Sequence, residues 1–292
     1  GQSATEDTAM AKQVAPQEDM AAGNAFVSKA STSAVQGIMS NRMASLRSGD
    51  AFVVGVSAGN SMSANSGFIQ AFGSEVEQSN TTKNANQTVF GYDADSSGVA
   101  IGIDGLTESG MVLGLSLSNS ETDITGKGAG KAKNTVSTYT ASVYADKATE
   151  SGYVEGSLTY GLSENKSSRK LTAGGLNRTY TGDYDSESIS LKIGAGAPKE
   201  TANDVFITPY GSLTGSLIQT DTYTEKSGTA SDNLRLKVQS DQITSLVGSA
   251  GLKAHVVSDF GTPMISLQVN NEFGDTTINN TNTYQGGGDA FK

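Results

Sequence analysis

The stretch that decides the fold is GYDADSSGVAIGID, residues 91–104, and two different structures fit it. In the first, five residues fall on the ligand and turn positions of an EF-hand calcium loop: Asp93, Asp95, Ser97, Gly98 and Asp104. In the second, a polar loop runs into a β-strand that places Val99, Ile101 and Ile103 on one face. An EF-hand needs a helix on each side of its loop, whereas residues 81–92 are rich in Asn and Thr and show no helical stripe. The strand is therefore the better interpretation, and we expect no metal site here.

The same alternation recurs along the chain and predicts about nine long strands. It is found in residues 67–77, 98–106, 110–124, 136–145, 153–165, 187–196, 206–219, 245–257 and 264–273. The polar face of these segments carries Gly, Ser, Thr and Ala with few charges, whereas the outer face of a water-soluble sandwich is usually more strongly charged. Small hydroxyl residues suit a polar lumen, so we expect the opposite, apolar face to meet lipid. That face includes Val99, Ile101, Leu113, Leu115, Leu158, Ile189, Leu191, Ile193 and Leu267.

The connections between the strands alternate in length. Short turns lie at 107–110, 149–152, 198–204 and 258–263, and long polar loops lie at 79–88, 125–134, 170–178 and 225–233. Short turns on one rim and long loops on the other are typical of outer-membrane barrels. The predicted fold is therefore all-β, an antiparallel transmembrane β-barrel. A soluble β-solenoid or adhesin sandwich is the alternative, but a solenoid needs a fixed short repeat, and the sequence has none.

A helix is expected before the first strand, at residues 23–47. This segment contains no proline and spaces Phe26, Ala30, Ala34, Ile38 and Met43 at helical intervals. Its remaining surface is polar, and its small residues make it slim. A slim polar helix fits a narrow polar tube, so we expect it inside the barrel; the alternative is an amphipathic helix packed on a sheet.

Composition excludes several classes of protein. The 292 residues carry a net charge of −10, whereas a nucleic-acid-binding protein usually has a basic face, so no nucleic acid is expected as a partner. The chain has no cysteine, which rules out disulfides, thiol nucleophiles and zinc sites built on sulfur. No run of apolar residues is long enough for a transmembrane helix, but a barrel crosses with alternating strands and needs none.

Four segments together resemble the C-terminal translocator of the autotransporters, the type V secretion proteins of Gram-negative bacteria. They are SNRMASLR (40–47), GFIQAFGSE (67–75), GYDADSSGVAIGIDG (91–105) and PYGSLTGSLIQTDTYTE (209–225). The resemblance implies a monomeric barrel of about twelve strands in the bacterial outer membrane. It also implies a helix threaded through the pore, an upstream passenger carried to the cell surface, and the barrel-assembly machinery and membrane lipid as partners.

On this basis we expect four segments. Residues 1–22 are a polar linker at the end of the passenger region, 23–50 the pore-spanning helix, 51–66 a connection and 67–292 the barrel. Some relatives cut their own helix between paired asparagines. By register with SNRMASLR, Gly37 and Ile38 occupy the positions of that pair. Neither residue can cyclise as an asparagine side chain does, so self-cleavage is not expected there.

The chain stops at GGGDAFK, whereas family barrels finish on an aromatic residue that closes a last strand. We therefore expect only about nine of the twelve strands, in a barrel that is incomplete at its C-terminus. A gap should separate the strand at 67–75 from the strand at 264–273, because neither has a further partner in this chain.

The function expected is a membrane translocator and anchor, which is not an enzyme and needs no cofactor. The residues expected to join helix and lumen are Ser33, Gln36, Ser40, Asn41, Arg42, Glu155, Lys192 and Tyr210. One alternative is a passive porin, which needs no helix ahead of its first strand. The other is a barrel hydrolase, but the single histidine, His255, should point into the lumen near a short-turn rim, away from both the lipid face and the long-loop rim.

Overall fold

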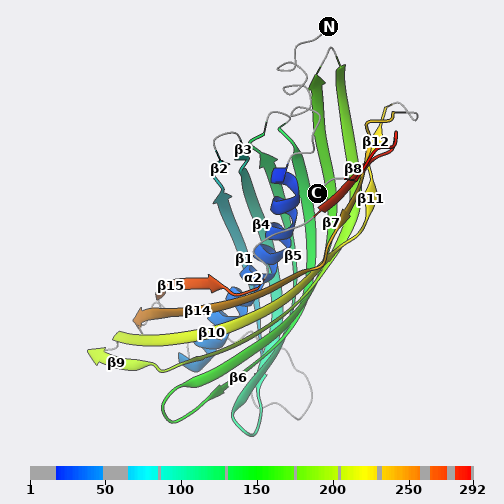
Figure 1. Cartoon of the computed structure of the whole chain (residues 1–292). Coiled ribbons are helices and arrows are strands. Elements are labelled where there is room, and N and C mark those ends of the chain that lie inside the picture. Colours follow the sequence, from blue (N-terminus) through cyan, green and yellow to red (C-terminus); the bar gives the residue numbers. More distant parts are fainter. Residues whose placement is uncertain are drawn as a thin grey trace.

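One curved antiparallel sheet wraps around one long helix in the computed structural model (Figure 1). The structure describes residues 18–48, 65–84, 87–128, 131–173, 176–202, 205–228, 232–256, 264–274 and 280–290. The expected linker at 1–22 and connection at 51–66 lie almost wholly outside these ranges.

Nine strands form the wall, in the order β1-β4-β5-β6-β7-β8-β10-β14-β15. Their bounds are β1 Asn65–Glu77, β4 Tyr92–Leu106, β5 Met111–Gly126, β6 Lys133–Ala148, β7 Tyr153–Ala173, β8 Leu176–Gly196, β10 Val205–Thr220, β14 Ile243–Val256 and β15 Met264–Glu272. Apart from short strands at the rims, each wall strand pairs with the wall strand next to it in the chain. The prediction of about nine long antiparallel strands is confirmed.

Seven shorter strands lie at the rims of the wall. They are β2 Thr81–Asn84, β3 Gln87–Val89, β9 Lys199–Ala202, β11 Tyr223–Thr224, β12 Lys226–Ser227, β13 Leu236–Ser240 and β16 Asn280–Tyr284. β2 and β3 form a hairpin, β9 extends β10, and β12 extends the wall beside β8. β11, β13 and β16 form a separate small sheet.

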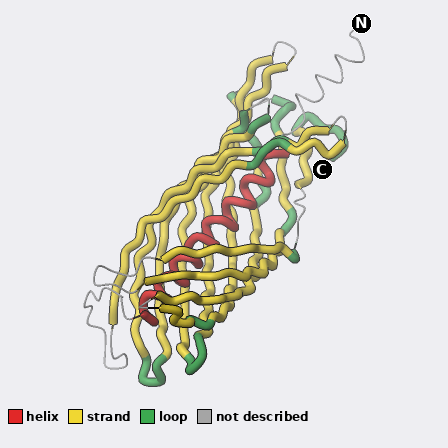
Figure 2. The backbone as a smooth tube through the Cα atoms, turned by 90° about the vertical axis from the view of Figure 1, so that its left-hand side faces the viewer, coloured by secondary structure: helices red, strands yellow, loops and turns green. Residues whose placement is uncertain are grey.

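The sheet is open. Among the described residues β1 pairs only with β4 and β15 only with β14, so no ladder joins the two ends. The predicted gap between these two strands is confirmed, and the wall is a half-barrel with the helix in its hollow (Figure 2). An unpaired strand edge exposes N–H and C=O groups, each of which costs several kcal/mol in hydrocarbon.

The stretch 91–104 is a strand, and the calcium loop is excluded. β4 carries Asp93 and Asp95 exposed on its outer side, whereas Asp104 is buried on the inner side. Carboxylates on opposite faces of one strand cannot converge on a single ion. The described residues also contain no group of three or more His, Asp or Glu side chains that could hold a metal ion.

The two faces of the wall differ as the alternation predicts. All nine residues expected to face lipid are exposed on the outer side; Leu115, for example, is 54% exposed, whereas its neighbour Ser116 is 4% exposed. On the inner side, hydroxyl pairs join adjacent strands, as in Ser118–Thr140 at 2.6 Å and Ser142–Thr159 at 2.9 Å. These pairs satisfy polar groups that burial would otherwise leave without partners.

The helix α2 spans Glu18–Ser48, so it begins five residues earlier than predicted and ends one residue later. The prediction of a helix in the lumen is confirmed, since α2 lies along the concave side of the sheet (Figures 1 and 2). Its 31 residues extend about 46 Å at the rise of an α-helix. Within the described residues, no helix combines the length and apolarity needed to cross a membrane.

Candidate functional site: the contact between helix and wall

An apolar cluster packs the C-terminal half of α2 against the wall. Val35, Ile38, Met39 and Met43 are buried in it, at 4% exposed or less. They pack with Ala100 and Tyr144 from the wall, and with partly buried Phe68 and Phe72 of β1. Among residues 29–47, whose side chains the structure describes, the buried apolar side chains lie on this side of α2, so the cluster fixes the rotation of the helix and points its polar residues at defined strands.

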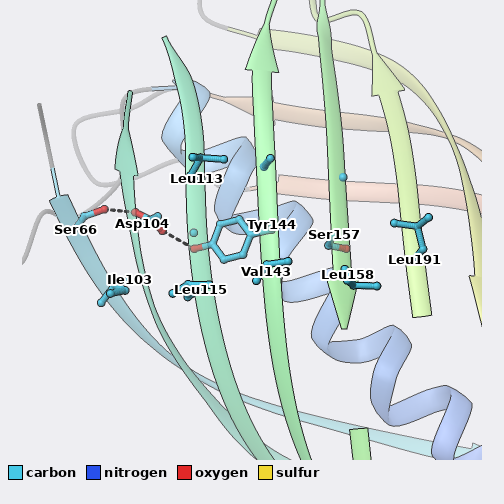
Figure 3. A pocket seen from close by; sticks show the side chains of 13 residues that line it. Ser66, Ile103, Asp104, Leu113, Leu115, Val143, Tyr144, Ser157, Leu158 and Leu191 are labelled. Atoms are coloured by element: carbon cyan, nitrogen blue, oxygen red, sulfur yellow. Dashed lines mark hydrogen bonds between the residues drawn. The ribbon is translucent and has the colours of Figure 1, made fainter. Parts of the chain in front are cut away.

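Arg42 forms the most complete polar contact between helix and wall. Its Nε donates to Asp104 Oδ2 at 2.7 Å and its Nη2 donates to Asp104 Oδ1 at 3.0 Å. The Tyr144 hydroxyl donates to Asp104 Oδ2 at 2.8 Å, and Ser66 also donates to this carboxylate (Figure 3). Asp104 is therefore buried but fully hydrogen-bonded, and its charge is paired in the fork geometry that arginine favours.

A second arginine, Arg47, lies one turn further along α2. It pairs with Asp146 of β6 and, at 3.4 Å, with Glu155 of β7. Its guanidinium also lies 3.5 Å from the centre of the Tyr153 ring. Arg42 Nη2 also donates to Ser66 of β1, so Arg42 and Arg47 tie the C-terminal end of α2 to four wall strands near the short-turn rim.

Further hydrogen bonds continue this contact along the middle of α2. Gln36 Nε2 donates to Ser190 Oγ at 3.1 Å, and Thr32 and Ser188 are 3.3 Å apart through their hydroxyls. Lys192 Nζ donates to Ser40 Oγ at 2.8 Å. These bonds all reach β8, on the opposite side of the helix contact from β4.

The N-terminal half of α2 contacts the last wall strand, β15. Lys29 forms an ion pair with Glu272 of β15, although 243 residues separate them in the chain. Since Arg42 is bound to β4, next to the first strand, α2 is attached near both ends of the open sheet.

The residues expected from the sequence fall into two groups. Gln36, Ser40, Arg42, Glu155 and Lys192 all take part in the contacts above. Three others do not: Ser33 and Asn41 are exposed on the other face of the helix, and Tyr210 donates to Gln268 Oε1 at 2.8 Å and lies under Lys253. The helix contacts expected for these three remain predictions.

Several partners in these contacts were not expected from the sequence, among them Ser66, Asp146, Tyr144 and Arg47. Asp146 lies one residue beyond the strand predicted at 136–145, yet it is an acid at a lumen-facing position, which is the signal that could have identified it. Asp104 was weighed as a calcium ligand and placed on the polar face of its strand, but it was not expected to contact the helix, although it is the single acid at a lumen-facing position in the apolar part of that strand.

A second polar network lies at the long-loop rim, on the same inner face. Arg169 of β7 donates to both carboxylate oxygens of Glu225, at 2.6 and 2.7 Å, and Tyr180 donates to Asp232 at 3.0 Å. Tyr184 of β8 stacks on Tyr223 of the small sheet, with ring centres 4.2 Å apart. The small sheet β11-β13-β16 therefore forms an inner layer over the extended β7–β8 hairpin, and we call it the rim layer.

The contacts described above hold a helix in a polar lumen and show no hydrolytic arrangement within the described part of the chain. His255, the single histidine, stacks on Phe206 with ring centres 4.9 Å apart. Lys192, Glu155 and the arginines are engaged in ion pairs and hydrogen bonds between helix and wall. Paired charges of this kind fix position and orientation.

Comparison with protein families finds a match to the autotransporter beta-domain over residues 67–292. Two curated proteins called outer membrane protein A, from Rickettsia conorii (strain ATCC VR-613 / Malish 7) and Rickettsia rickettsii, are each 32% identical over 168 residues. The match covers 54% of this chain but only 8% and 7% of those proteins, so the chain spans less than a tenth of their length.

Two solved structures share the fold. The translocator domain of the autotransporter NalP from Neisseria meningitidis has a TM-score of 0.60 at 18% identity, covering 88% of this chain and 87% of that domain. The β domain of the Bordetella autotransporter BrkA has a TM-score of 0.54 at 22% identity, covering 74% of this chain and 82% of that domain.

Proposed function

Since this chain belongs to the autotransporter family by its β-domain and so is an outer-membrane translocator domain, we propose that α2 is its pore helix, held in the lumen as the tether of the passenger. The observation that carries this proposal is the pairing of Arg42 with Asp104 inside the wall. A helix that merely covered a sheet would not need a buried charge pair, because surface positions keep such charges hydrated at lower cost.

The distribution of contacts supports a tether. Four ion pairs of three helix cations, Lys29, Arg42 and Arg47, attach α2 to β15, β4, β6 and β7. Removing one partner of a buried ion pair costs about 3–5 kcal/mol, so the buried pairs of Arg42 and Arg47 resist withdrawal of the helix. A passive porin would gain nothing from such attachments.

The family implies an attached passenger and an outer-membrane setting. We further propose that the passenger lies on the N-terminal side of α2, that the barrel-assembly machinery inserts the domain, and that it works as a monomer. We also propose that the domain is not an enzyme, since the lumen acids Asp104, Asp146 and Glu155 are paired with arginines of the helix.

Protease protection on intact cells tests the tether. The protein is expressed in a Gram-negative host with an epitope placed before residue 18, and the cells are treated with protease. We expect the epitope to be digested while α2 stays protected inside the wall. An epitope that is digested only after lysis would exclude surface display.

Two variants make the test specific to the contacts. The double variant Arg42→Ala/Arg47→Ala should leave the epitope on the surface but expose α2 to protease. The matched control is Ser33→Ala/Asn41→Ala, which changes two exposed positions on the same helix and should leave α2 protected. Equal digestion of both variants would contradict the tether.

Depletion and sedimentation test the partners. Loss of the barrel-assembly machinery should leave the protein in a form that unfolds in detergent without heating, and sedimentation in detergent should give the mass of one chain. An unchanged folded fraction after depletion, or a stable dimer, would contradict the corresponding proposal.

A further inference from the structure

A hollow of about 570 Å³ interrupts the outer surface of the wall toward the short-turn rim (Figure 3). Large apolar side chains that point outward surround it: Ile103, Leu113, Leu115, Val143, Leu158 and Leu191. Residues at inward-facing positions of the strands, such as Gly114 and Ser157, also line it. The floor of the hollow is therefore the backbone of the sheet itself.

The hollow arises from the two smallest side chains on this part of the outer face. Ala145 of β6 and Gly156 of β7 are register partners and lie side by side. Leu113 and Ile193 are the next residues in the same row, so a low centre is flanked by branched side chains. A Cβ built on Gly156 would meet only the Lys192 carbonyl oxygen, at 3.6 Å, so the space above this glycine is open.

A hollow in this belt cannot stay empty without a cost. The surrounding side chains would lose dispersion contacts on one side, and water would find no polar partner among the apolar side chains that surround the space. The filler has to be apolar, and the lipid-facing belt is continuous with the hollow on every strand that lines it. In an outer-membrane domain the available apolar filler is an acyl chain.

One charged residue lies at the edge of this belt. Lys147 follows Ala145 by two residues on β6, which places it on the same outer face, one row closer to the turn. It is exposed and donates to the Ser109 carbonyl oxygen. An ammonium group at the level of the short turns matches the phosphate of a lipid whose tail lies in the hollow.

We propose that this hollow is a binding site for one acyl chain of an anionic phospholipid, with the lipid phosphate held by Lys147. Short turns lie on the periplasmic side of outer-membrane barrels, so the lipid belongs to the inner leaflet.

Native mass spectrometry of the detergent-solubilised protein, titrated with phosphatidylglycerol, tests the site. We expect one lipid to be retained per chain. Ala145→Leu fills the hollow and should lower the retained fraction at least tenfold. The matched control is Ala141→Leu, an exposed alanine on the same face of the same strand that does not line the hollow, and it should retain the lipid.

Two further arms identify the headgroup and the occupant. Lys147→Gln should weaken retention of phosphatidylglycerol several-fold while leaving that of phosphatidylcholine unchanged. Equal retention in Ala145→Leu and the parent protein, or equal loss in Ala141→Leu, would overturn the site. A second copy of the chain as the occupant would appear in sedimentation as a dimer that Ala145→Leu dissociates, and that result would also overturn the lipid assignment.

Discussion

Arg42 in the helix and Asp104 in β4 form a forked ion pair across 62 residues of sequence, and Asp104 has almost no contact with solvent. Arg42→Ala would leave this carboxylate buried with only Ser66 and Tyr144 as donors. We expect Arg42→Ala to lower the free energy of unfolding of the domain by about 3–5 kcal/mol, as for other buried pairs that lose one partner. Thermal unfolding in detergent measures the loss, with Asn41→Ala as the exposed control on the neighbouring residue.

An exchange of charges separates the pairing from the packing of Arg42. The double variant Arg42→Asp/Asp104→Arg should recover part of the stability that either single change removes. If Arg42→Ala were no more destabilising than Asn41→Ala, the ion pair would not be holding the helix.

The outer belt predicts that the cost of introducing a charge depends strongly on its position along one strand. Leu115 and Glu121 both point outward from β5, but Leu115 lies in the apolar belt and Glu121 lies above it among polar residues. Leu115→Arg should cost about 2–4 kcal/mol, the range for a cation at the bilayer midplane, whereas Glu121→Arg should cost far less. Unfolding by denaturant in lipid vesicles measures both, and similar losses would mean that the belt is misplaced.

A glycine makes the Tyr144 contact possible. A Cβ on Gly114 would lie 2.1 Å from the Tyr144 ring, so Gly114→Ala should displace the ring and break its bond to Asp104. We expect a loss of about 1–3 kcal/mol, typical of overpacking. Gly215→Ala is the control, because no atom lies within 4 Å of a Cβ built on Gly215. In the same thermal unfolding experiment, the stability of this variant should equal or exceed that of the parent protein.

The rim layer should respond to acid through Asp232. Burial alone would raise the pKa of this carboxyl, but hydrogen bonds from the Leu234 amide, Tyr180 and Arg178 together hold the pKa below its ordinary value. A lowered folded-state pKa stabilises the folded form above the ordinary value of about 3.9, and this stability is lost as the pH falls through the folded-state pKa.

Tyrosine near-ultraviolet circular dichroism between pH 6 and pH 2 should follow this loss, since Tyr180 bonds directly to Asp232. Asp232→Asn should flatten the acid-dependent change and lower stability at neutral pH. Asp289→Asn, a change at an exposed acid after β16, should behave as the parent protein. An unchanged acid transition in Asp232→Asn would rule out this carboxyl as its cause.

Strand faces could be predicted from the sequence because the period of two assigns every residue of a strand once one side is known. This is why all nine expected lipid-facing residues are on the outer surface. The helix contacts were harder, since they depend on the register between strands and on the rotation of α2. Ser33 and Asn41 are as polar as Gln36, but the cluster around Met39 turns them away from the wall.

The N-terminal bound of α2 shows another limit. Residues 18–22 continue the helix although they carry little apolar periodicity, because a helix without proline can extend from a packed segment by adding backbone bonds. The ion pair of Arg47 with Asp146 could not be predicted from the sequence either, since it joins residues 99 apart and no local pattern links them.

The attachment of Lys29 to Glu272 sets an order in time. A ribosome makes Lys29 long before Glu272, and their contact closes a loop of 243 residues, which is among the slowest kinds of contact to form. We therefore expect the Lys29 end of α2 to gain this last ion pair only after β15 has joined the sheet, later than the contact of Thr32 with Ser188 of β8. A segment attached ahead of the helix would then be less constrained before β15 joins the sheet than after it.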